Sequence, residues 1–102
     1  MKATPGPGRE ATPPLLRPYL MGEYRLANLV VMAPLTRCRA TNPDLLPTEL
    51  HVRYHSQRAS AGLIITEGTW ISLDAVGCHD VPGLFTDAQV RARSAVTEAV
   101  HP

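Results

Sequence analysis

The chain has no long apolar segment, few aromatic residues and almost no net charge. None of its apolar runs approaches the roughly 20 residues that cross a bilayer, and its first residues contain no apolar signal core. We therefore expect no membrane partner and a cytoplasmic location. The 10 basic residues nearly balance the 9 acidic ones, giving a formal net charge of +1. This balance offers no electrostatic reason to expect a nucleic-acid partner.

Cysteine is also scarce. Cys38 and Cys78 are the only two in 102 residues, and such a sequence does not resemble a small secreted domain built on disulfides. One disulfide between them is an alternative, but reduced and structurally incidental cysteines are the favoured interpretation. A hydrophobic content of 44% is ordinary for a folded protein, and the length suits one modest domain.

The remaining sequence divides into a tail and an alternation of strands and helices. Residues 1–14 contain four prolines and two glycines without periodicity, which predicts a flexible tail. Residues 21–26 alternate weakly around Gly22, which suits a small hairpin. The first strand is predicted over 29–33, and it ends at Pro34, which cannot donate to a strand ladder.

A helix and a second strand follow a polar loop. We expect the helix over 49–60, with Thr48 as its N-cap, and the strand over 63–66 after Gly62. The last helix has the best local signal. Thr86 and Gln89 have capping-box spacing, and an apolar stripe follows at helical spacing, formed by Ala92, Val96, Ala99 and Val100.

This order predicts parallel strands and a ligand site at their C-terminal ends. Strands buried on both faces are continuous apolar runs, and ligands of such sheets gather beyond their carboxyl ends. Thr36 follows the first strand and could hydrogen-bond a ligand, whereas Gly68 follows the second and lets a flat ligand approach the backbone. Ordinary turn residues are the alternative interpretation. Two βα units cannot close a sheet, because a (β/α)₈ barrel needs about 250 residues.

Three other groups of residues could carry chemistry. His51 and His55 have the i, i+4 spacing of metal ligands, but the glutamate of the H-E-x-x-H motif is absent, so partly exposed helix histidines are favoured over a metal site. Glu67 and Asp74 could perform acid–base chemistry, although Glu67 is expected to orient a loop or pair with an arginine. Arg37 could bind a phosphate or a carboxylate, or form a structural ion pair.

Taken as strings, residues 28–37 and 57–69 resemble the Old Yellow Enzyme family of flavin-dependent ene reductases. Residues 82–86 and 96–101 continue the resemblance, which covers 15–101. Within the family, the strings resemble the plant 12-oxophytodienoate reductases, and bacterial N-ethylmaleimide-type reductases share much of the pattern. The resemblance implies an α/β fold that is the N-terminal part of a (β/α)₈ TIM barrel, incomplete, with about two βα units preceded by a small hairpin. The flavin oxidoreductase domain would then occupy 15–102.

The resemblance also implies FMN as cofactor and NADPH as reductant. The positions that match flavin contacts are Pro34, Leu35, Thr36 and Gly68, with Thr36 hydrogen-bonded to the isoalloxazine edge. Two positions depart from the family pattern, since Leu29 replaces a common arginine and His55 a common tyrosine. No catalytic residue and no metal ligand is assigned. The family's flavin-binding glutamine, substrate-binding His/Asn pair and proton-donating tyrosine correspond to positions beyond Pro102.

The function implied is reduction of the C=C bond of α,β-unsaturated carbonyls, with a small enone or oxylipin as substrate, in oxylipin or jasmonate-type metabolism. Because this truncated chain lacks those later positions, we expect it to be inactive alone. The alternative is a non-catalytic, pseudogene-like fragment that folds only with a partner, such as a full-length relative.

Overall fold

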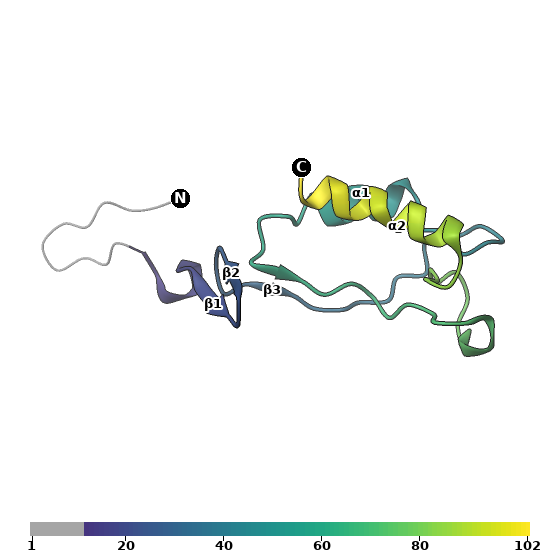
Figure 1. Cartoon of the computed structure of the whole chain (residues 1–102), viewed down its shortest axis with the longest axis horizontal. Coiled ribbons are helices and arrows are strands. Elements are labelled where there is room, and N and C mark those ends of the chain that lie inside the picture. The colour runs from purple at the N-terminus through teal and green to yellow at the C-terminus, as the bar shows by residue number, and fades with distance from the viewer. Residues whose placement is uncertain (1–11) are drawn as a thin grey trace, which may run out of the picture.

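The computed structural model describes residues 12–102, in which a hairpin precedes alternating strands and helices (Figure 1). Most of the predicted tail over 1–14 therefore lies outside the described residues. The 3₁₀ turn η1, Pro14–Leu16, opens the described part and buries none of its residues. The predicted hairpin is confirmed: β1 (Tyr19–Met21) pairs antiparallel with β2 (Tyr24–Leu26). Gly22 in its turn has φ +62°, a conformation that glycine adopts without steric cost.

The predicted βαβ unit is also confirmed. Strand β3 (Val31–Met32) pairs in parallel with β4 (Leu63–Ile64), and the register places Val31 opposite Leu63. Both strands are shorter than the 29–33 and 63–66 expected. Each strand has only one hydrogen-bonded neighbour, which limits the length of the ladder. Beyond the paired residues there is one further hydrogen bond at each end, from Gly62 N–H to the Val30 carbonyl and from Ile65 N–H to the Met32 carbonyl.

Helix α1 covers Glu49–Ser56 between the two strands, ending four residues before the predicted boundary. Thr48 is the N-cap residue as predicted, and Glu49 lies in the first turn, where a negative charge is favourable. Residues 57–61 continue as tighter turns, because the N–H groups of Arg58, Ala59 and Ala61 bond to carbonyls three residues back. The apolar and polar pattern of the sequence does not distinguish such turns from a helix.

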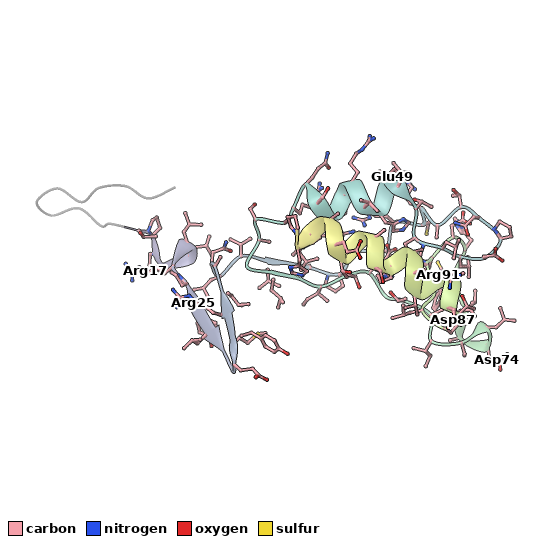
Figure 2. All side chains as sticks on the ribbon, turned by 45° about the horizontal axis from the view of Figure 1, so that its top comes forward. Arg17, Arg25, Glu49, Asp74, Asp87 and Arg91 are labelled. Carbon is pink, nitrogen blue, oxygen red and sulfur yellow. The ribbon has the colours of Figure 1, made fainter. Side chains whose placement is uncertain are left out.

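Helix α2, Asp87–Val100, begins four residues after Gly83, which forms an isolated parallel bridge with Trp70 rather than the predicted turn. The predicted capping box is present: Gln89 N–H donates to the Thr86 hydroxyl, and the Gln89 amide oxygen accepts from Thr86 N–H. Helices α1 and α2 pack side by side, and Figure 1 shows both on the same side of the β3 segment. Their charged residues Glu49, Asp87 and Arg91 are exposed on the outside (Figure 2).

The interior between strands and helices is unusually polar. Among the described residues, the buried apolar side chains are Ala40, Pro47, Val81, Pro82 and Val96, whereas the buried polar ones are His51, His55, Glu67 and Gln89. The strands keep much of their apolar surface in solvent: Val31 is 47% exposed and Ile65 45%. The helices therefore cover only part of the strand surface. Within residues 12–102, no helix has the length and apolar character of a membrane span.

One side chain fixes the beginnings of both parallel strands. The Asn28 amide oxygen accepts hydrogen bonds from Val30 N–H and Gly62 N–H, each at 2.9 Å, and its amide nitrogen donates to the Ser60 carbonyl at 2.9 Å. Glycine is needed at position 62, because a Cβ there would collide with the Asn28 carbonyl group. This contact explains the close approach of two segments that lie 34 residues apart.

Candidate functional site

The C-terminal ends of β3 and β4 carry the predicted site residues. The observed register pairs Val31 with Leu63 and Met32 with Ile64; Thr36 lies four residues beyond the end of β3 and Gly68 four residues beyond the end of β4. Both residues are exposed, as are Pro34 and Leu35 before them, with Leu35 at 55%. The structure therefore brings the two chain segments together at one edge, as parallel pairing requires.

The residues that follow Thr36 and precede Gly68 face the opposite way. Arg37 and Glu67 point toward the helices, where the Glu67 side chain is only 1% exposed. Side chains of an extended chain alternate between its two faces, so Thr36 and Gly68 share the face that the helices leave open. A Cβ built on Gly68 would meet nothing within 4 Å. Thr36 and Gly68 are thus both exposed, and the space beside Gly68 is unobstructed.

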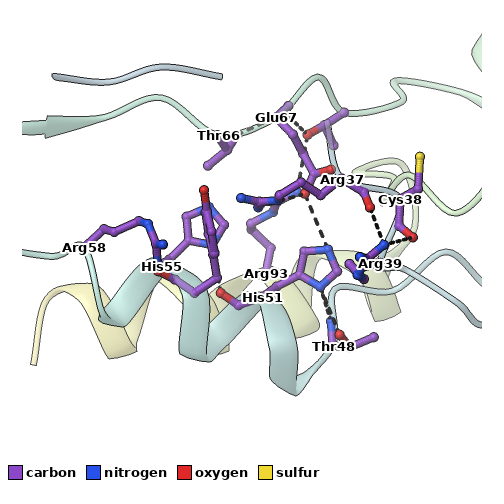
Figure 3. A network of polar contacts seen from close by, with 12 residues as sticks. Arg37, Cys38, Arg39, Thr48, His51, His55, Arg58, Thr66, Glu67 and Arg93 are labelled. Atoms are coloured by element: carbon purple, nitrogen blue, oxygen red, sulfur yellow. Dashed lines mark hydrogen bonds and ion pairs between the residues drawn. The ribbon is translucent and has the colours of Figure 1, made fainter. Parts of the chain in front are cut away.

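On the helix side, Glu67 is the centre of a buried polar cluster (Figure 3). Its Oε2 lies 3.4 Å from His51 Nε2 and 4.0 Å from Arg37 Nη2. Arg93 of α2 joins the cluster, donating to the Thr69 hydroxyl at 3.3 Å. Burial lowers the pKa of Arg93, and the charge of Glu67 opposes that shift. The prediction that Glu67 pairs with an arginine is confirmed.

His51 is held in one neutral form. Thr48 N–H donates to its Nδ1 at 2.9 Å, so Nδ1 is the acceptor and the proton of the neutral ring is on Nε2, facing Glu67. Burial lowers the pKa of His51; Glu67 opposes this shift, whereas Arg93, His55 and Arg37 add to it. The ring thus serves as a helix cap at Nδ1, whereas Nε2 faces Glu67 without making a hydrogen bond.

A tyrosine fixes the orientation of Arg37. The Arg37 guanidinium carbon lies 3.3 Å from the centroid of the Tyr54 ring, and that of Arg58 lies 3.8 Å from the same ring. Cations over an aromatic ring are attracted by its negative face. Arg37 is therefore held by Tyr54 and Glu67 on the helix side, which supports the structural ion pair over the predicted anion-binding alternative.

Two sequence-based interpretations need correction. His51 and His55 are not partly exposed, since they are only 2% and 1% exposed, and His55 Nδ1 lies 2.8 Å from the His51 carbonyl oxygen. The helix is covered on that face by the strand-end segment and by α2, which the moderate periodicity of α1 did not reveal. Asp74 lies in the exposed turn η2 (Leu73–Ala75), at the far end of the molecule in Figure 2, so it does not share a site with buried Glu67. Within the described residues, no group of three or more His, Cys, Asp or Glu could hold a metal ion.

Tyr54 and Arg93 were not identified from the sequence. A signal for Arg93 exists, because Gln89, Arg93 and Val96 recur at the i, i+4, i+7 spacing of one helix face, and Gln89 and Val96 are both buried. The Gln89 side chain also donates to the Asp44 carbonyl at 2.9 Å and so attaches the loop after β3 to α2.

Comparison of the chain with known proteins identifies its family. The sequence profile of the NADH:flavin oxidoreductase / NADH oxidase family matches residues 14–102. The chain belongs to this family. It is 45% identical over 89 residues to 12-oxophytodienoate reductase 1 of Oryza sativa subsp. japonica, covering 86% of this chain and 23% of the relative. The Old Yellow Enzyme resemblance is thereby confirmed, and the family supports FMN as cofactor with a nicotinamide reductant.

Solved structures of this family superpose on the chain. The Old Yellow Enzyme homologue from Zymomonas mobilis gives a TM-score of 0.81 at 48% identity, covering 87% of this chain and 25% of that one. Morphinone reductase in complex with tetrahydroNAD gives a TM-score of 0.79 at 49% identity, covering 88% and 24%. The chain thus spans about a quarter of the length of the relatives it matches.

Proposed function

We propose that this chain supplies the first two βα units of a (β/α)₈ flavin barrel whose activity is NADPH-linked reduction of the C=C bond of α,β-unsaturated carbonyls. The observation that carries the proposal is the parallel pairing of β3 with β4, which are followed by the exposed residues Thr36 and Gly68. Family membership supports the cofactor and the reaction class. The partial barrel domain would occupy 15–102, and we propose a cytoplasmic location.

In this proposal the open face holds the flavin ring. FMN would supply the hydride chemistry, accepting hydride from NADPH and delivering it to the substrate. The Thr36 hydroxyl would hydrogen-bond the ring edge, Pro34 and Leu35 would contact it with apolar surface, and Gly68 would allow close approach. Arg37 and Glu67 contribute no charge to this face, because each is engaged on the helix side.

The test is a titration of the purified chain with FMN, followed by the flavin absorption and fluorescence, and then by NADPH oxidation with 2-cyclohexenone. Loss of one neutral hydrogen bond corresponds to about threefold to tenfold weaker binding, so Thr36→Ala is expected to weaken FMN binding by about that factor. Thr41→Ala is the matched control, since Thr41 is an exposed loop threonine outside the strand ends. Equal affinities in both variants and the parent chain would refute the Thr36 assignment.

We further propose an oxylipin substrate of the 12-oxophytodienoate type, supported by the 45% identity to the rice reductase. The test compares turnover of 12-oxophytodienoate and 2-cyclohexenone by this chain combined with the remaining three quarters of that rice relative. A preference for the oxylipin that is equal to that of the rice enzyme would support the proposal. Faster reduction of the simple enone would contradict it.

The second candidate function is non-catalytic association with a partner, such as a full-length relative. It is favoured by exposed apolar residues in and just after the strands: Val31, Leu35 and Ile65 are 47%, 55% and 45% exposed. Such surface is normally covered in parallel sheets. Size-exclusion chromatography and circular dichroism distinguish the two: a cooperative folded monomer that binds FMN contradicts association as a requirement, whereas a chain that folds only with the relative supports it.

A further inference from the structure

Two cysteines that lie forty residues apart in the sequence meet in the structure. Ala40 N–H donates to the Asp80 carbonyl at 2.9 Å, and each cysteine lies two residues before one of these partners, so Cys38 and Cys78 occupy equivalent places on adjoining segments. Partial burial and then the Cys78 thiol raise the pKa of Cys38, and a side-chain hydrogen bond joins the two thiols. Both cysteines are free, with Cys78 exposed and Cys38 half-buried. The backbone bond between Ala40 and Asp80 thus brings the two cysteine-bearing segments together, and the influence of Cys78 on the pKa of Cys38 indicates that the thiols are close neighbours.

We propose that Cys38 and Cys78 are a reversible oxidation site that forms an intramolecular disulfide with a small-molecule disulfide, such as oxidised glutathione, as the oxidant. The exposed Cys78 thiolate attacks one sulfur of the oxidant, forming a mixed disulfide and releasing one glutathione thiolate. The Cys38 thiolate then attacks the Cys78 sulfur, releasing the second. The two protein thiols lose two electrons, the oxidant gains them, and the two protons pass to the departing thiolates.

The position of the pair favours a cross-link over a metal site. Among residues 12–102, these thiols belong to no group of three metal-ligating side chains, although His79 and Asp80 follow Cys78 directly. The disulfide would join the segment after β3 to the segment before Val81. Arg39 donates to the carbonyls of Arg37 and Cys38, so the cross-link would also restrain the backbone that carries Arg37.

The experiment measures the equilibrium between dithiol and disulfide in glutathione buffers of known ratio. The full chain is equilibrated, quenched by acid, alkylated and digested, and mass spectrometry counts the cross-linked peptide that joins the two cysteines. The equilibrium constant gives the effective concentration of one thiol for the other, measured in native buffer and in concentrated urea. In urea a flexible loop gives a value in the millimolar range, and we expect the folded chain to exceed it by about tenfold or more.

Two controls make the result decisive. Cys38→Ser and Cys78→Ser are each expected to give only the mixed disulfide with glutathione and no cross-linked peptide. Cys78→Ser combined with Val76→Cys keeps nearly the same loop length but moves the thiol two residues along an exposed segment, and we expect its effective concentration to fall toward the urea value. The proposal is overturned if native and urea values agree, if the displaced thiol pairs equally well, or if oxidation gives only intermolecular dimers.

Discussion

Acidification should destabilise the fold through His51. In the unfolded chain this ring titrates at its ordinary value of 6.5, whereas burial among arginines lowers its pKa in the fold. Below pH 6.5 the unfolded chain therefore binds a proton that the folded chain does not. By linkage the free energy of unfolding is fully retained above pH 6.5 and falls as the pH decreases toward the folded pKa.

The magnitude follows from the structure. His51 is 2% exposed, and its Nδ1 already accepts the Thr48 N–H, so protonation at that nitrogen would break the helix cap. If the ring stays neutral in the fold, the loss reaches about 1.4 kcal/mol at pH 5.5, with a slope approaching about 1.4 kcal/mol per pH unit below that. Contact with Glu67, which favours the charged ring, makes this value an upper limit.

The assay is urea denaturation followed by circular dichroism between pH 7.5 and 5. His51→Gln is the informative variant, because glutamine at this capping-box position still accepts the Thr48 N–H but does not titrate. We expect the variant to lose less stability on acidification than the parent chain. His101→Gln is the control, since His101 is exposed at the end of α2. Identical pH slopes for the parent and His51→Gln would refute the reasoning.

Three further substitutions test the interior. Glu67→Gln removes the counter-charge of half-buried Arg93 and Arg37 and should cost about 1 to 3 kcal/mol in urea denaturation. Exposed Asp74→Asn should change stability by less than about 0.5 kcal/mol, and equal effects would contradict the pairing of Glu67 with the arginines. Gln89→Ala leaves the Phe85 and Thr86 N–H groups and the Asp44 carbonyl without their Gln89 partner, which should lower the free energy of unfolding by about 1 to 3 kcal/mol. Gln57→Ala is the control, and this exposed substitution should cause no measurable loss of stability. Gly62→Ala forces a Cβ against the Asn28 carbonyl and should lower the melting temperature measured by circular dichroism. Gly68→Ala places its Cβ in open space, so it should leave that temperature unchanged and weaken FMN binding. A stable Gly62→Ala protein would show that the strands can separate there.

The order of elements could be predicted because it depends on local chemistry. The hydroxyl of Thr86 and the amide of Gln89 define a helix start within four residues, and both hydrogen bonds are present. The apolar runs around Val31 and Leu63 predicted the parallel pair. Element boundaries were less accurate, because the turns over 57–61 differ from a helix only in which carbonyl each N–H meets.

The buried polar cluster could not be predicted from spacing. Glu67, Arg37 and Arg93 come from three separate segments, and only the packing of α2 over the strand ends brings them together. Helical spacing placed His51 and His55 on one face but did not show that this face is buried. The sequence left a pairing of Cys38 with Cys78 open only as an alternative, because their proximity depends on a long-range backbone hydrogen bond at Ala40. The flavin contacts at Pro34, Leu35, Thr36 and Gly68 stay a prediction.

The hydrogen bonds of the Asn28 side chain and the predicted ligand contacts lie toward opposite ends of the same pair of strands. The Asn28 hydrogen bonds to Val30 and Gly62 set the strand alignment where the strands begin, whereas Thr36 and Gly68 lie where they finish. Substitutions at the ligand-facing edge can therefore accumulate without shifting the alignment. A family that varies its substrates would gain from such an arrangement, because new chemistry could be explored at one end while the other keeps the framework intact.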